Sequence, residues 1–263
     1  MAPPTLSPPD RAAIEAYDAM APVYDAFTAH HRHDVWTDML ERLLRPLGLP
    51  VRGRLLDVGC GTGKSFVPWQ ERGWSVVACD ASPPMLAHAA MRAKGDTVTL
   101  VADGRDLAEL GAFDLVTMTD DVANCLAPED LAAAFGGAAR HLAPGGLLAF
   151  DVNTLRMYRT FFAGTEVHEA DGLLVLWRGG APVTFRPGDA AEADLDAFVA
   201  LDGGWQRRRA VHRQRHHPVA LLAEALEEAG LEVVAVHGVS DDCDLGALDE
   251  LLHPKAVIVA RRG

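Results

Sequence analysis

Residues 54–65, RLLDVGCGTGKS, carry the side chains whose types and spacing point most directly to ligand chemistry. The stretch ends in Gly63-Lys64-Ser65, as does a phosphate-binding P-loop, in which backbone amides wrap the phosphates and the lysine contacts them. That loop requires a further glycine at position 58, where this chain has Val58. The sequence therefore argues against a nucleoside triphosphate as the ligand.

Two other glycine patterns overlap in the same segment. The dinucleotide-binding pattern G-x-G-x-x-G fits Gly59 and Gly61 but then needs a small residue where Lys64 stands. The pattern D-x-G-x-G-x-G fits throughout, from Asp57 to Gly63. A carboxylate at the mouth of such a loop attracts a cationic group and repels a triphosphate, while glycines let a ligand lie against bare backbone. These residues predict a ligand that carries an amine and no phosphate.

This segment resembles the first motif of the class I S-adenosylmethionine-dependent methyltransferases, in which an apolar strand leads into D-x-G-x-G-x-G. DASPPML at residues 80–86 is similar to the family's D-x-S-x-x-M-L run, and PGG at residues 144–146 to its P-G-G turn. Asp80 follows Gly59 by 21 residues, near the spacing at which a carboxylate accepts hydrogen bonds from ribose hydroxyls. The resemblance implies a methyltransferase of the small-molecule or natural-product type, with S-adenosylmethionine as cofactor.

The resemblance also implies which residues bind the cofactor. Asp80 would hold the ribose, Ala81 and Met85 would pack near the adenine, and Asp103 and Gly104 would lie at the adenine amino group. The full implied set is Tyr17, Tyr24, Asp57, Gly59, Cys60, Gly61, Asp80, Ala81, Met85, Asp103, Gly104 and Thr119.

An early segment repeats Tyr-Asp, with Tyr17 and Tyr24 seven residues apart. Two residues at that spacing share one face of a helix, but Pro22 lies between them and predicts an interruption, so we expect the tyrosines to line a bend. In methyltransferases that this chain resembles, such a segment folds over the cofactor and its tyrosines contact the methionine end. The alternative is that they pack in the core or in a lid.

The chemistry of methyl transfer needs little covalent help, because the sulfonium is already a strong electrophile. The protein must hold the acceptor in line and exclude water, and a carboxylate or histidine is suited to removing a proton from a hydroxyl or ammonium acceptor. Asp121 follows the fourth expected strand, where ligands bind in such sheets, and is the first candidate. The alternative is that Asp120 or Asp121 only caps a turn.

A second candidate source of a base is VHRQRHHP at residues 211–218. His212 and His217 lie on opposite faces of the expected strand, and a histidine that titrates near neutrality suits proton removal. A solvated basic strand is the alternative. No carboxylate lies at a matching ligand spacing near these histidines, so we expect no metal site.

The elements that position these residues alternate between short apolar runs and helical segments. The runs predict a parallel sheet covered on both faces, in an α/β, doubly wound, seven-stranded Rossmann-like methyltransferase fold. The expected strands are residues 55–58, 75–79, 98–101, 115–118, 147–152, 231–237 and 256–260. The expected helices are residues 11–20, 36–47, 65–72, 83–93, 128–142 and 218–229.

The alternation lapses in the middle of the chain. Short runs at 173–177, 182–186, 193–199 and 205–212 predict an antiparallel β insertion that acts as a lid or dimer surface. The expected organisation is a frayed proline-rich tail and helical cover at 1–50, a cofactor-binding core at 51–153 and 216–263, and the inserted lid at 154–215.

Composition limits the partners. The formal net charge of -13 disfavours nucleic acid, and a small-molecule acceptor is expected, with a possible homodimer through the insertion. The four cysteines form no C-x-x-C pair, which predicts a reducing, cytoplasmic setting. No apolar run is long enough to span a membrane, and a membrane partner is not expected.

The predicted function is transfer of a methyl group from S-adenosylmethionine to an oxygen or nitrogen of a small metabolite, and we expect this metabolite to be an intermediate of natural-product biosynthesis. Two alternatives stay open at this point. One is an enzyme of this fold that catalyses a different reaction, such as a cyclisation, and the other is a regulator that senses S-adenosylmethionine.

Overall fold

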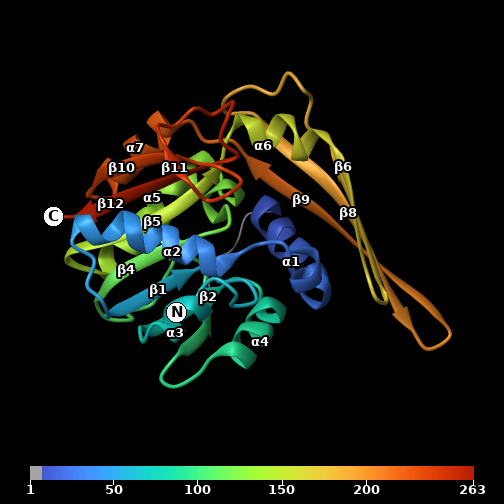
Figure 1. Ribbon diagram of the computed structural model, residues 1–263, viewed down its shortest axis with the longest axis horizontal. Coiled ribbons are helices and arrows are strands. Elements are labelled where there is room, and N and C mark those ends of the chain that lie inside the picture. The colour runs from blue at the N-terminus through green and yellow to red at the C-terminus, as the bar shows by residue number, and fades with distance from the viewer. Residues whose placement is uncertain (1–7) are drawn as a thin grey trace.

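The computed structural model describes residues 8–263 and contains a twisted central sheet with a second sheet beside it (Figure 1). The central sheet has eight strands in the order β11-β10-β12-β5-β4-β1-β2-β3. Neighbouring strands from β3 to β5 run parallel, and β12 runs antiparallel to both β5 and β10. The strands are β1 Arg54–Val58, β2 Ser75–Asp80, β3 Val98–Val101, β4 Phe113–Met118, β5 Leu142–Asn153, β10 Leu231–Val239, β11 Leu245–Gly246 and β12 Lys255–Arg262.

The doubly wound α/β prediction is confirmed, and the two-residue β11 brings the sheet to one strand more than expected.

Helices cover both faces of this sheet because its strands are apolar on both sides. Leu56 packs with α5 and α7, whereas its neighbour Leu55 packs with α2, α3 and α4. The longer helices are α1 Pro8–Phe27, α2 His33–Leu44, α4 Pro83–Arg92, α5 Leu131–His141 and α7 Val219–Glu228. The short ones are α3 Val67–Glu71, α6 Leu155–Arg159, η1 Arg45–Leu47, η2 Val122–Cys125, η3 Pro128–Asp130 and η4 Phe161–Ala163.

The insertion forms a four-stranded antiparallel sheet in the order β6-β7-β8-β9. Its strands are β6 Thr165–Ala170, β7 Leu173–Gly179, β8 Ala190–Leu201 and β9 Gly204–Arg215. The β8–β9 hairpin projects away from the central sheet (Figure 1). One face of this sheet packs on α1, where Met20 and Val23 meet Val175 and Trp177. The insertion is therefore joined to the N-terminal helix by a shared apolar core.

One predicted strand of the insertion was wrong, and one observed strand was not predicted. Residues 182–186 form a turn in which the Phe185 amide donates to the Pro182 carbonyl, and Phe185 is buried as a single anchor. Strand β6 was not predicted, because its sequence TEVHEA is polar and mostly exposed and so carries no apolar run.

The interruption expected at Pro22 was also wrong, because α1 continues through it to Phe27. Proline removes one backbone hydrogen bond from a helix. Pro22 is exposed, while Met20, Ala21 and Val23 on either side are buried. Burial of that apolar face outweighs the lost bond. Residues 1–7 of the expected tail lie outside the described residues, and Pro8 begins α1.

The helices between residues 8 and 263 include none that is both long and apolar enough to cross a membrane.

Candidate active site

The loop after β1 adopts backbone conformations that suit glycine. Gly59, Gly61 and Gly63 have φ of 72°, 54° and 89°, a region that other residues rarely enter. A Cβ atom on Gly59 would lie 2.6 Å from Val122 Cγ2. The left-handed backbone and the close approach of Val122 both require glycine here. The absence of side chains also leaves the backbone of Gly59 and Gly61 open to the first pocket.

Asp57 stabilises this loop from within. Its side chain is buried, and it accepts hydrogen bonds from the hydroxyls of Ser65, at 2.5 Å, and Thr117, at 2.8 Å. Burial raises the pKa of Asp57 from 3.8 to about 6, although the two hydroxyls act in the opposite direction. Lys64 also packs locally, since its ammonium donates to the backbone carbonyl of Thr28 at 2.7 Å. The two residues that suggested a P-loop, Lys64 and Ser65, thus make structural contacts.

The raised pKa of Asp57 predicts a pH-dependent stability. A carboxyl group with a higher pKa in the folded state binds its proton more tightly there, so its contribution to folding weakens as the pH rises from about 4 through 6. Asp57→Asn cannot titrate. The free energy of unfolding of this variant, relative to the wild type, should therefore increase by on the order of 3 kcal/mol between pH 4 and pH 7. Urea titrations across that range measure it, and a constant difference would refute the assignment.

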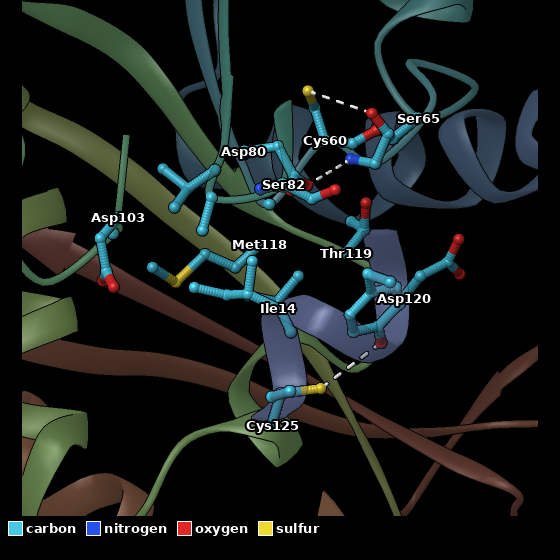
Figure 2. A pocket seen from close by; sticks show the side chains of 18 of the residues that line it. Ile14, Cys60, Ser65, Asp80, Ser82, Asp103, Met118, Thr119, Asp120 and Cys125 are labelled. Atoms are coloured by element: carbon cyan, nitrogen blue, oxygen red, sulfur yellow. Dashed lines mark hydrogen bonds between the residues drawn. The ribbon is translucent and has the colours of Figure 1, made fainter. Parts of the chain in front are cut away.

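A first pocket opens over the glycine loop at the carboxyl ends of β1, β2 and β4. Figure 2 shows Asp103 and Asp120 on opposite sides of it, with Asp80 between them, and Ile14 of α1 is among the residues that line it. Helix α1 therefore forms one wall of the pocket and the sheet edge forms another.

Asp80 lies at the end of β2 with its carboxylate held by backbone amides. One oxygen accepts from the Gly61 amide and the other from the Ser82 amide, both at 2.8 Å. Burial raises the pKa of Asp80, and these hydrogen bonds partly offset the rise. The hydroxyl of Ser82 donates to Asp18 on α1 at 2.6 Å. Asp80 thus links the glycine loop to the loop after β2, at the pocket wall.

Asp103 lies on the far side of the first pocket, paired with Arg105. The guanidinium Nη2 of Arg105 is 2.6 Å from the Asp103 carboxylate. Burial alone would raise the pKa of Asp103, but the hydrogen bonds and charge of Arg105 lower it. Gly104, between them, also lines the pocket.

A second pocket adjoins the first, between α1, the insertion and the end of the central sheet. Its walls include Phe27, Phe161, Phe162 and Trp177, which pack against one another. Tyr17 and Tyr24 line both pockets, and their ring centroids are 6.2 Å apart. Because α1 is continuous, these two tyrosines stand on one helix face at the boundary between the pockets.

Three carboxylates and one ammonium meet at this boundary. Lys255 Nζ lies 2.6 Å from Asp151, 3.2 Å from Asp121 and 3.8 Å from Asp120. Burial alone would lower the pKa of Lys255, but the three carboxylates raise it. Asp151 also accepts hydrogen bonds from the backbone amides of Asp120 and Asp121. The group holds more negative than positive charge.

Both Asp120 and Asp121 have left-handed backbone conformations, with φ of 60° and 57°. Such values are uncommon outside glycine and are best tolerated by Asn and Asp. The side chain of Asp121 makes no capping hydrogen bond to the following turn, η2. It accepts a hydrogen bond from Gln214 instead, and it lines the second pocket.

The two predicted catalytic histidines, His212 in β9 and His217 just after it, lie in different surroundings. His212 lines the second pocket next to Tyr17, at a ring-centroid distance of 5.3 Å, and burial lowers its pKa. His217 lines neither pocket. Its Nε2 lies 3.2 Å from the Leu126 carbonyl oxygen, and burial lowers its pKa to about 4. His212 is therefore placed to meet a ligand, and His217 packs against the loop after η2.

Comparison with known proteins decides the family. Residues 55–146 match the family model described as a methyltransferase domain. Over 226 residues the chain is 30% identical to the putative methyltransferase GWCH70_2453 of Geobacillus sp. (strain WCH70), covering 84% of this chain and 90% of that protein. The chain belongs to the class I S-adenosylmethionine-dependent methyltransferases.

Two further comparisons agree with this family. The methyltransferase is 29% identical to the putative methyltransferase YqeM of Bacillus subtilis (strain 168), covering 91% of this chain and 96% of that protein. Its structure is similar to that of the sugar N-methyltransferase KedS8 from Streptoalloteichus sp. ATCC 53650, with a TM-score of 0.73 and 26% identity, covering 91% of this chain and 92% of that chain. S-adenosylmethionine is the cofactor of this methyltransferase.

Most of the predicted cofactor residues of the methyltransferase come together at the first pocket. Those that line it are Tyr17, Tyr24, Gly59, Cys60, Gly61, Asp80, Ala81, Asp103, Gly104 and Thr119. Asp57 and Met85 are buried and are not among its lining residues. Of the predicted catalytic residues, Asp121 and His212 line the second pocket.

Sequence reasoning missed several polar residues of the methyltransferase site. Asp151 and Lys255 come from neighbouring strands β5 and β12, and Gln214 joins Asp121 to Asn153 through hydrogen bonds. Asp151 lies near the carboxyl end of β5, where ligands bind in such sheets, and that position is a signal for it. Lys255 begins the antiparallel β12, so the same rule gives no signal for it. Gln214 was not named as a site residue, although alternation along the expected strand places it on the same face as His212, which lines the second pocket with it.

Proposed function

We propose that this methyltransferase binds S-adenosylmethionine in the first pocket and transfers its methyl group to a nitrogen or oxygen of a small metabolite in the second pocket. The observation that carries the proposal is the boundary formed by Tyr17 and Tyr24, which line both pockets. A methyl group that leaves the first pocket between these side chains enters the second.

The first pocket offers matching groups along the length of the cofactor. Asp80 is suited to the ribose hydroxyls, and Asp103 with Gly104 to the adenine on one side. On the other side Thr119 and Asp120 line the end of the pocket toward which the methionine portion would extend.

The second pocket has the character of a small-molecule site. Such sites are lined mainly by apolar and aromatic side chains with a few placed polar groups, and this pocket has that composition. Tyr, Phe and Trp side chains line much of it, and Asp121, Gln214 and His212 line it as polar groups joined by contacts of Gln214. Aromatic walls exclude water from the reacting atoms, and Asp121 is placed to orient an amine or to accept a proton from the acceptor.

The similarity to KedS8, a sugar N-methyltransferase, supports an acceptor of natural-product type. A panel of amino sugars, hydroxylated sugars and phenols, incubated with cofactor labelled on the methyl carbon, tests the proposal. We expect label in the product of at least one acceptor. Turnover of an acceptor without label transfer would support a different reaction of this fold, and cofactor binding with no turnover of any kind would support a regulator.

Met157→Trp tests the role of the second pocket, because Met157 lines it and is only partly buried. The larger side chain should fill the acceptor space, so that the turnover number divided by the Michaelis constant falls at least about tenfold while cofactor affinity stays within about twofold. Met91→Trp is the matched control, since Met91 is exposed and lines neither pocket. Equal activity of the two variants would place the acceptor elsewhere.

A further inference from the structure

Two histidines and a carboxylate from distant parts of the chain converge at the boundary between the pockets. His31 lies in the turn after α1, His33 begins α2, and Asp120 follows β4. His31 Nδ1 and His33 Nε2 are each 3.6 Å from the same atom, Asp120 Oδ2. All three side chains are part-buried, and each offers one atom able to ligate a metal ion.

The spacing of these atoms suits a metal ion. The three ligand atoms lie within 4.8 Å of one another. Zinc binds imidazole nitrogen and carboxylate oxygen at about 2.0–2.2 Å, which places two ligands of a tetrahedral site about 3.4 Å apart. The two contacts to Asp120 are close to that value already, and rotation of the histidine rings completes the approach.

The charge at this place also suits a metal ion. Asp120, Asp121 and Asp151 are three carboxylates grouped around the single ammonium of Lys255. The described group thus holds two more negative than positive charges in a part-buried setting, where unpaired charge is costly. A divalent cation beside Asp120 balances this excess.

We propose that His31, His33 and Asp120 bind a divalent transition-metal ion, of the kind represented by Zn²⁺ and Co²⁺. Two imidazole nitrogens and one carboxylate favour these ions over Mg²⁺ and Ca²⁺, which prefer oxygen ligands alone. His33 and Asp120 line the first pocket and His31 lines the second. On the function proposed above, on which this point rests, the ion would lie where cofactor and acceptor meet.

Such a site has a direct chemical use beyond the function proposed above. Three protein ligands leave at least one coordination position open for water or for an acceptor oxygen. A coordinated hydroxyl loses its proton more readily, because the cation stabilises the oxyanion. The ion would thereby favour acceptors with a hydroxyl group next to the point of transfer. This site was not predicted from the sequence, because Asp120 lies almost ninety positions after His31 and His33, and the histidines that were singled out lie at 212–217.

Direct binding titrations test this proposal and do not require a measurement of enzyme activity. Protein that carries no affinity tag is stripped with a chelator and titrated with Zn²⁺ by calorimetry and with Co²⁺ by visible absorption. We expect one ion per chain, with Mg²⁺ giving no signal. The double variant His31→Ala/His33→Ala should bind Zn²⁺ at least about 100-fold more weakly, because it loses two ligands.

The matched control is His30→Ala, which removes the neighbouring histidine that does not belong to the cluster. It should keep the wild-type affinity for Zn²⁺. Circular dichroism and thermal unfolding establish that the variants are folded, and His33→Gln provides a milder change if the double variant is not. Absence of stoichiometric Zn²⁺ and Co²⁺ binding by the wild type, or equal Zn²⁺ affinity in the His33→Gln and His30→Ala proteins, would overturn the proposal. Neither result would bear on methyl transfer itself.

Discussion

Replacing Asp80 with alanine is expected to weaken S-adenosylmethionine binding by about 100-fold. A hydrogen bond to a charged group contributes about 1.5–3 kcal/mol, and each 1.4 kcal/mol is a factor of ten in affinity. Asp80 would lose its bonds to the ribose hydroxyls. It would also release the Gly61 and Ser82 amides, to which its two oxygens are bonded in the structure, so that the glycine loop is less well ordered.

Isothermal titration calorimetry measures this effect, with Asp80→Asn as a second variant that keeps the shape of the side chain. Asp96→Ala is the control, because Asp96 is an exposed carboxylate that lines neither pocket. Its affinity for the cofactor should match that of the wild type. Unchanged affinity in Asp80→Ala, with the protein folded, would remove Asp80 from the cofactor site.

Asp121→Asn is expected to lower the turnover number by about 100-fold while the dissociation constant of S-adenosylmethionine stays within about twofold. Proton removal by a placed base typically contributes 10²–10⁴-fold, and the amide of asparagine neither accepts the proton nor carries the charge that orients an amine. Asparagine is the suitable replacement because Asp121 has a φ of 57°, a conformation that Asn also tolerates.

Steady-state kinetics with an acceptor found by label transfer, together with cofactor calorimetry, separate the two effects. Asp114→Asn is the matched control, since Asp114 lies at the start of β4 and Asp121 lies just beyond its end. The control should retain full turnover. If Asp121→Asn does so as well, the base or orienting group lies elsewhere, and His212 is the next residue to replace.

The parts of the site that the sequence predicted are those whose geometry is local. Asp57 and the three glycines lie in one short segment, and the strand and helix on either side fix their positions. Asp80 ends β2 and Asp103 follows β3, and the carboxyl ends of these two strands must meet at one edge of a parallel sheet. Spacing and strand order were sufficient to bring these residues to one pocket.

The parts that the sequence did not predict depend on packing between distant segments. Pro22 predicted a break in α1, but the apolar face that α1 buries against the insertion keeps the helix whole and places Tyr17 and Tyr24 side by side. The contact of Lys255 with Asp151 crosses from β12 to β5. Nothing in the local pattern of either strand reveals such a contact.

The position of His217 could not be predicted from the local pattern either. Alternation along an expected strand placed it on one face, but β9 ends at Arg215, and the chain then turns so that His217 meets the Leu126 carbonyl. Because β9 ends before His217, strand alternation does not apply to this side chain. The end of β9 depends on its pairing with β8, which the local sequence does not reveal.

A crystal structure of the protein with the product S-adenosylhomocysteine tests the central claim most directly. We predict that its ribose hydroxyls lie within hydrogen-bonding distance of Asp80 and that its sulfur faces the second pocket between Tyr17 and Tyr24. Product bound outside the first pocket, or a sulfur that faces away from the second, would contradict the account.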